Sequence, residues 1–126
     1  MAIKDEDLRG ASSRKALASL LGLDTATTFK ATADVNDGPV PALSPVVITA
    51  DGTATVYTKD DAAPTVAETS QVGFTVSDRV TDSEGKLNVA VMRQAHVRRP
   101  HLSAAAKAVV TAAPAAALTH IIIEEA

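Results

Sequence analysis

The feature that most constrains the fold is the stretch of residues 71–99, in which apolar and polar side chains alternate along two arms. Because successive side chains of a strand point to opposite faces, this spacing predicts two strands, each with one apolar face. The sequence DSEG between the arms is typical of a turn, and Gly85 is free to adopt positive φ. The stretch therefore predicts an antiparallel sheet with one face on a core and one in solvent. The predicted apolar positions are Phe74, Val76, Leu87, Val89 and Val91.

The polar face of this predicted hairpin has two interpretations. It is either an ordinary solvated sheet face or a shallow RNA platform, on which Arg and Lys meet phosphates while Thr, Ser and Asn reach 2′-hydroxyls and bases. Stacking aromatic residues are missing from it, so such a platform would differ from one that stacks bases. The candidate RNA-binding residues are Thr75, Ser77, Arg79, Lys86 and Asn88.

The composition fits one domain, residues 1–126, with a core of small aliphatic side chains. Hydrophobic residues make up 46% of the chain but aromatic residues only 2%, so burial through oligomerisation becomes attractive. The absence of cysteine excludes disulfides, thiol catalysis and Cys-based zinc sites. The formal net charge is −3, so the protein as a whole is not basic and its total charge does not indicate nucleic-acid binding. Basic residues are concentrated at residues 93–107, which contain six Arg, Lys and His residues and no acidic one. This segment is either a solvated loop or a positively charged surface for RNA.

Three segments are expected along the chain. Residues 1–24 read as helical, with a helix near 4–21 whose leucine stripe is Leu17, Leu20 and Leu21. Residues 25–100 read as β-hairpins and a meander, including a strand at Thr27–Ala33 and a type I′ hairpin at Asp51-Gly52. Residues 101–126 combine an alanine-rich segment, helical over 104–113, with a last strand over 118–123.

No motif in the sequence carries enzyme chemistry. His96, His101 and His120 lack the spacing of a metal motif, and neither a nucleophile elbow nor a phosphate-binding glycine loop is present. We therefore expect no catalytic residue, no metal and no cofactor. No apolar run approaches the roughly 20 residues of a membrane span, and the acidic N-terminus is unlike a secretion signal, so a soluble, unprocessed protein is expected.

Four segments together resemble a known family: TTFKATADVNDG, SPVVITADGTATVYTKDD, QVGFTVSDR and KLNVAVMRQ. Their order over residues 27–94 resembles the coat proteins of single-stranded RNA bacteriophages, the leviviruses. The resemblance implies an α+β fold, in which an antiparallel meander is extended across a homodimer and covered on one face by helices. It also implies an icosahedral T=3 virion shell assembled in the bacterial cytoplasm, with an RNA hairpin of the genome bound to the inward sheet face. The five candidate residues match that family's RNA-facing positions.

The ends of the chain depart from the family pattern. Family members follow their last strand with helices that clasp the partner subunit, whereas here the last strand is followed directly by the end of the sequence, THIIIEEA. Written after that strand, the N-terminal sequence IKDEDLRGASSRKALASLLGL supplies an acidic linker and a leucine-containing helix. We therefore expect a circular permutation, with the usual C-terminal helix at the N-terminus packing on the sheet and with Met1 close to Ala126.

A second hypothesis belongs to a different class of protein. In it the chain is a small β-rich binding module, or a tail, decoration or adaptor component of a DNA phage. This hypothesis predicts a monomer or a small ring without nucleic acid, whereas the coat hypothesis predicts closed shells that contain RNA. An enzyme with an unrecognised site is the third hypothesis, which the lack of a titratable cluster disfavours.

Overall fold

The structure is a computed structural model that describes residues 26–33, 39–58 and 65–125. The helix expected near residues 4–21, with its leucine stripe, lies outside the described residues, and so do the turn at 36–38 and both ends of the chain. The expected packing of that helix and the expected proximity of Met1 and Ala126 therefore remain predictions.

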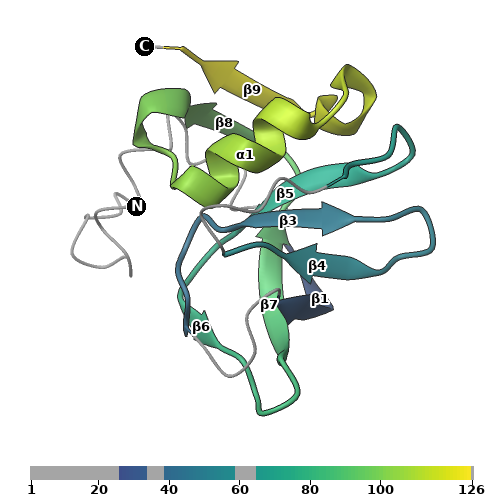
Figure 1. The fold of residues 1–126 in the computed structure, drawn as a ribbon, viewed down its shortest axis with the longest axis vertical. Helices are drawn as coiled ribbons and strands as arrows, with labels where there is room; N and C mark the ends of the chain where they lie inside the picture. Colours follow the sequence, from purple (N-terminus) through teal and green to yellow (C-terminus); the bar gives the residue numbers. More distant parts are fainter. Residues whose placement is uncertain (1–25, 34–38, 59–64, 126) are drawn as a thin grey trace.

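Five strands form a closed barrel (Figure 1). Around the barrel their order is β1, β4, β3, β5 and β7. Because the barrel is closed, β1 lies between β4 and β7. The β1–β4 pair is parallel and the other four pairs are antiparallel. The strands are β1 (Thr27–Ala33), β3 (Pro45–Ile48), β4 (Ala54–Val56), β5 (Gln71–Thr75) and β7 (Lys86–Met92).

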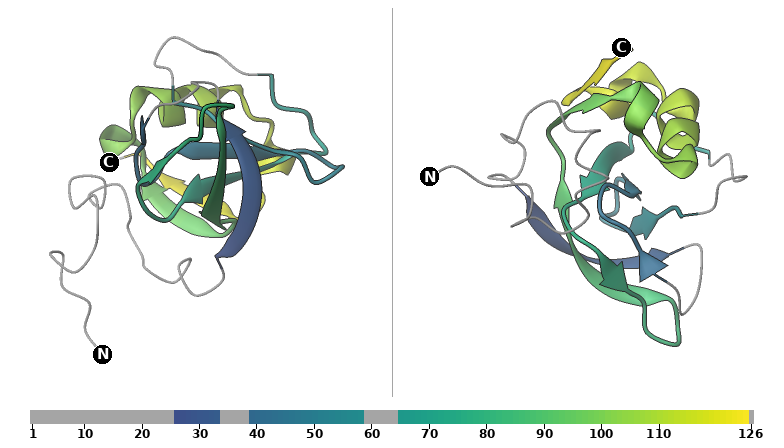
Figure 2. Two further views of the ribbon diagram at one scale, coloured as in Figure 1. Left: turned by 90° about the horizontal axis from the view of Figure 1, so that it is seen from below. Right: turned by 90° about the vertical axis from the view of Figure 1, so that its left-hand side faces the viewer.

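A second layer covers one side of the barrel, where α1 lies over β5 and β3 (Figures 1 and 2). In this layer the helix α1 lies in sequence between two strands, β8 and β9, which pair in parallel. Ser103 caps α1 by accepting a hydrogen bond of 3.1 Å from the amide of Ala106. The layer consists of β8 (Ala95–Arg98), η4 (Arg99–His101), α1 (Ala104–Ala112), η5 (Ala115–Leu118) and β9 (Ile121–Glu124). A two-stranded ribbon of β2 (Pro39–Val40) and β6 (Arg79–Val80) completes the fold.

This architecture corrects the predicted fold class. The described residues are mostly β-structure with one α-helix, near the C-terminus, and the central sheet is a closed barrel rather than an open meander. Each barrel strand has a neighbour on both sides, so none offers a free edge through which the sheet could extend into a partner. The α+β prediction, with a dimer-spanning sheet, is therefore wrong.

The small aliphatic side chains fill the barrel, as the composition predicts. Ala and Val predominate in its interior, where Val46 and Val56 are completely inaccessible to solvent. A five-stranded barrel is narrow, so β-branched and methyl side chains fill it without aromatic residues. Phe74, the largest side chain that is fully buried, instead packs on Ala106 and Val110 of α1. The helix expected over 104–113 thus provides part of the cover for the sheet.

The predicted hairpin of residues 71–99 forms only in part. Strands β5 and β7 pair at two positions, Phe74 with Met92 and Thr75 with Val91, and then separate. The chain between them forms β6, which pairs with β2 instead. Gly85 adopts a φ of 77° in the turn that leads into β7, as predicted. The second arm of the hairpin is confirmed, because Leu87, Val89 and Val91 are buried while Lys86 and Asn88 are exposed.

Other local predictions agree with the structure. The strand at Thr27–Ala33 is confirmed, as are the helix within 104–113 and the β3–β4 hairpin around Asp51-Gly52. The last strand is present but begins at Ile121 and not at residue 118, since residues 115–118 form η5. That hairpin differs from prediction in its turn. Gly52 has a φ of 89°, but Asp51 is not among the residues with positive φ, so the type I′ assignment is wrong.

Candidate binding groove

A groove with a volume of about 690 Å³ lies where the β3–β4 turn and the start of β7 approach β1. The strand register brings its walls together, since Thr32 pairs with Lys86, Lys30 with Asn88 and Ala31 with Ala54. Along β1 the residues alternate between buried alanines and exposed polar side chains, which places Lys30 and Thr32 on the outer face. The polar side chains that line the groove are Lys30, Thr32, Asp51, Thr53, Asp82, Lys86 and Asn88.

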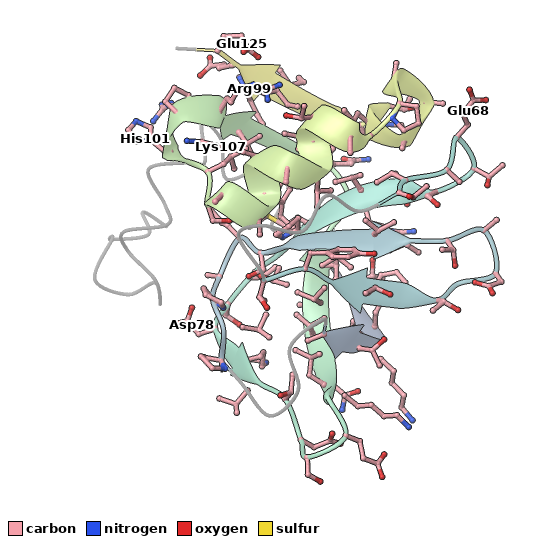
Figure 3. All side chains as sticks on the ribbon, viewed as in Figure 1. Glu68, Asp78, Arg99, His101, Lys107 and Glu125 are labelled. Atoms are coloured by element: carbon pink, nitrogen blue, oxygen red, sulfur yellow. The ribbon has the colours of Figure 1, made fainter. Side chains whose placement is uncertain are left out.

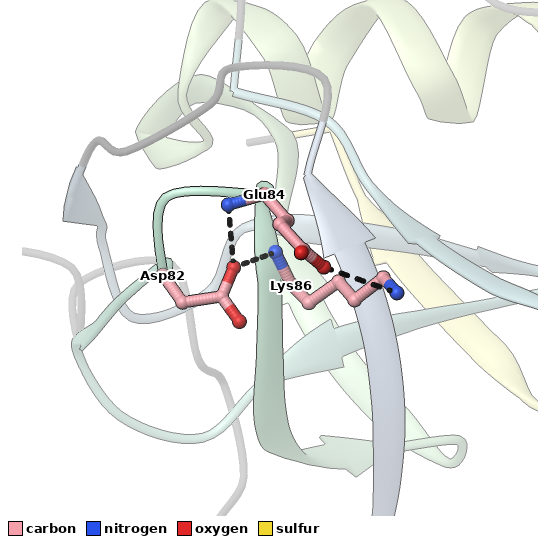
Figure 4. Close-up of polar contacts among 3 residues, drawn as sticks. All are labelled: Asp82, Glu84 and Lys86. Carbon is pink, nitrogen blue, oxygen red and sulfur yellow. Dashed lines mark hydrogen bonds and ion pairs between the residues drawn. The ribbon is translucent and has the colours of Figure 1, made fainter.

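One wall of the groove is fixed by the turn before β7 (Figure 4). A carboxylate oxygen of Asp82 accepts hydrogen bonds from the amides of Glu84, at 2.8 Å, and Lys86, at 3.0 Å. The amide of Lys86 makes the larger contribution to lowering the pKa of Asp82. Lys86 Nζ lies 3.4 Å from Glu84 Oε2, but both side chains are well exposed, so this ion pair contributes little to stability.

The opposite wall is fixed by the β3–β4 turn. The carboxylate of Asp51 accepts hydrogen bonds from the hydroxyl of Thr49 and from the amide of Thr53, the latter at 3.0 Å. The Thr49 hydroxyl is the main cause that lowers the pKa of Asp51 to about 2. The groove therefore combines two carboxylates that stay ionised at neutral pH with two lysine ammonium groups, and its formal charge is balanced.

The five candidate RNA-binding residues do not form one surface. Lys86 and Asn88 share the groove, whereas Arg79 is exposed on β6 beside a separate cleft, and Ser77 is half-buried. Thr75 is completely buried. Its hydroxyl donates to the carbonyl of Pro41 and accepts from the amide of Ser44, each at 3.0 Å. Thr75 thus holds the loop between β2 and β3 and does not reach the outer face.

The basic segment of residues 93–107 is partly neutralised by acids from the end of the chain. His96 Nε2 and Arg98 Nε lie 3.2 and 3.5 Å from carboxylate oxygens of Glu124. Arg99 Nε lies 3.0 Å from Glu125, and Figure 3 shows the two side chains together beside β9. The register of β8 against β9 produces these contacts, because Arg98 pairs with Glu124. Three of the six basic residues, His96, Arg98 and Arg99, therefore lie beside a carboxylate that comes from outside the segment.

Sequence reasoning missed most of the groove. Lys30 and Thr32 carried a usable signal, because they alternate with Ala31 and Ala33 in a strand that was predicted with the correct ends. Asp51 and Asp82 were recognised as turn residues, but nothing local indicates that the two turns line one groove. Their proximity follows from barrel closure, because β1 pairs with both β4 and β7, which lie far from it in the sequence.

The described residues contain no group of three or more His, Cys, Asp and Glu that could hold a metal ion. None of the helices in the described ranges has the length and apolar character needed to span a bilayer. Comparison of the chain with protein-family models, with curated proteins and with solved structures finds no match.

Proposed function

We propose that the protein is a non-enzymatic binding module that attaches to a larger protein assembly, as a tail, decoration or adaptor component of a DNA phage particle does. In this role the barrel is a rigid support, and the groove between β1, β7 and the β3–β4 turn contacts the assembly. The resemblance of residues 27–94 to the coat proteins of single-stranded RNA phages is the reason for proposing a phage particle as the assembly. The protein is then a part added to a shell or tail and not the subunit that builds the shell.

The closed barrel is the observation that carries this proposal. A coat subunit of the kind that the sequence resembles needs an open sheet that continues into its partner, and the barrel strands have no free edge. The buried position of Thr75 and the separation of Arg79 from Lys86 also remove the continuous polar sheet face that would bind an RNA hairpin.

The charge of the groove favours a protein surface over a nucleic acid as its ligand. Nucleic-acid sites concentrate Lys and Arg against phosphates, and carboxylates in the same site repel the phosphate backbone. Here Asp51 and Asp82 line the same groove as Lys30 and Lys86. A protein surface with both signs of charge complements such a groove and is selected by it, because a surface of either single sign meets repulsion.

The first experiment measures what the purified full-length protein forms. Light scattering, negative-stain microscopy and the ratio of absorbance at 260 and 280 nm are recorded with and without nuclease treatment. We expect a monomer or a small ring without nucleic acid. Uniform closed shells that contain nuclease-protected RNA would contradict the proposal and favour the coat-protein hypothesis.

The second experiment tests attachment and the role of the groove. The protein is co-expressed with the shell and tail proteins encoded by the same genome, and its co-sedimentation with their assemblies is measured. We expect co-sedimentation that is lost in Lys30→Glu/Lys86→Glu. The matched control is Arg79→Glu/Lys107→Glu, which makes the same change of charge at two exposed residues outside the groove. Equal binding by the groove variant and the wild type would rule the groove out as the contact surface.

A further inference from the structure

A second cleft, of about 230 Å³, lies between the start of β5, the β7–β8 turn and the turn before β9. The residues that line it are Gln71, Arg93, Gln94 and His120. It shares no residue with the groove described above. Three segments far apart in the sequence thus place an arginine, a histidine and two glutamines around one opening.

The framework of this cleft is held by backbone and ring contacts. The amide of Ala95, next to Gln94, donates a hydrogen bond of 3.2 Å to the carbonyl of His120, which ties the β7–β8 turn to the start of β9. Gln71 is fixed by its pairing with Ile48 in the barrel. The guanidinium carbon of Arg93 lies 5.8 Å from the centre of the Phe29 ring, a cation–π contact that orients the side chain.

The chemistry of the lining is that of an anion site. The Arg93 guanidinium offers N–H donors in a planar fork, and both glutamine amides and the imidazole can add N–H donors. Among the described residues that line the cleft, none carries a carboxylate. Arginine pairs with a carboxylate through two parallel hydrogen bonds, a geometry that lysine cannot reproduce. The neighbouring amides suit the remaining lone pairs of a carboxylate.

We propose that this cleft binds a carboxylate group supplied by an acidic peptide segment of a partner protein. Arg93 is the primary contact, and Gln71, Gln94 and His120 complete the donor set. The cleft is small and open, so it accepts one side chain or chain terminus rather than an extended ligand. The proposal concerns a site distinct from the groove and does not depend on the proposed function.

The test is a titration of the ¹⁵N-labelled full-length protein with N-acetyl-tetraglutamate, followed by NMR. Saturable shifts are expected in the Nε–H signal of Arg93 and in the side-chain amide signals of Gln71 and Gln94. Arg93→Gln should weaken binding by about tenfold, because a charged hydrogen-bond pair is lost. Arg93→Lys should also weaken it, since the charge remains but the fork does not. The matched control, Arg79→Gln, removes an exposed arginine outside the cleft and should bind as the wild type does.

Three outcomes would overturn the proposal. The first is Arg93→Gln binding the peptide as tightly as the wild type. The second is an equal loss in Arg79→Gln, which would mean that the peptide responds to total charge only. The third is a parallel titration in which inorganic phosphate binds more tightly than the peptide, which would assign the cleft to phosphate-like anions.

Discussion

Thr75 on β5 and Pro41 in the loop between β2 and β3 are joined by a hydrogen bond of 3.0 Å, from the threonine hydroxyl to the proline carbonyl. The same hydroxyl accepts the amide of Ser44, also at 3.0 Å. One side chain therefore satisfies two backbone groups of a loop that contains Leu43 at a φ of 62°, an uncommon conformation for a residue with a side chain.

Replacing Thr75 with valine should destabilise the protein by about 1 to 3 kcal/mol, because a buried amide loses its partner while the shape of the side chain is kept. The measurement is the free energy of unfolding in urea. Thr75→Ser keeps the hydroxyl, so its free energy of unfolding should fall by less than that of the valine variant. A valine variant as stable as the wild type would show that the loop does not depend on these two bonds.

Gly73 on β5 has no room for a side chain. A Cβ atom built there would lie 2.5 Å from Val91 Cγ1 and 2.8 Å from the carbonyl oxygen of Met92. Gly73→Ala should therefore destabilise the barrel by on the order of 1 to 3 kcal/mol through overpacking. The measurement is thermal or urea unfolding, with Gly52→Ala as a comparison whose cost has a different cause. At Gly52 there is open space, and the cost is backbone strain of about 1 to 2 kcal/mol.

A double mutant tests the cause of the Gly73 effect. Adding Gly73→Ala to a Val91→Ala background should cost less than adding it to the wild type, because the nearest clashing atom is absent. Strictly additive free energies of unfolding would show that Val91 is not the source of the clash.

The Asp51 carboxyl links stability to acid pH. Hydrogen bonds from Thr49 and Thr53 lower its pKa to about 2 in the folded protein, below its ordinary value of 3.8. Its contribution to stability is present above pH 3.8 and is lost as the pH falls toward 2, because the unfolded state then binds the proton more readily. We expect Asp51→Asn to flatten the decline of stability between pH 4 and pH 2. An NMR titration in which Asp51 has an ordinary midpoint would contradict this.

Glu124 of β9 and the following Glu125 should determine how basic the neighbouring surface is. Glu124→Gln/Glu125→Gln removes the carboxylates that face His96, Arg98 and Arg99, so the protein should elute from heparin at higher salt. Glu68→Gln/Glu84→Gln changes the net charge equally at two exposed sites away from β8 and is the matched control, since its single ion pair is the exposed one of Glu84 with Lys86. Equal elution shifts in the two variants would show that net charge alone governs retention. The unfolding free energy should change by roughly 1 kcal/mol at most per exposed pair.

Local patterns predicted the elements of this fold better than their assembly. The alternation in Thr27–Ala33 and around Leu87 identified strands and their outer faces, because a strand with one wet face shows its period in the sequence. The same rule failed at Thr75. Strand β5 is buried on both sides, between the barrel interior and the layer of α1, so its polar residue lies inside.

Barrel closure was the part that no local pattern could reveal. Strand β1 pairs with β4 in parallel and with β7 in the opposite direction, and each pairing depends on the complete set of strands. The groove inherits this dependence, because Lys30, Asp51 and Asp82 meet only when β1 is in place. The ion pairs of Glu124 with β8 likewise follow from a parallel pairing across α1.

The position of β1 in the barrel also sets the order of events during synthesis. β1 leaves the ribosome before any other barrel strand. One of its two neighbours, β7, ends at Met92 and is the last barrel strand to be made. Until then β1 has an unsatisfied edge, and the β3–β4 and β3–β5 pairings can form without it. Closure thus waits for most of the chain, and distant pairings of this kind make folding slow. We therefore expect a stage of synthesis in which the edge of β1 that faces β7 is unpaired and open to pairing with other chains.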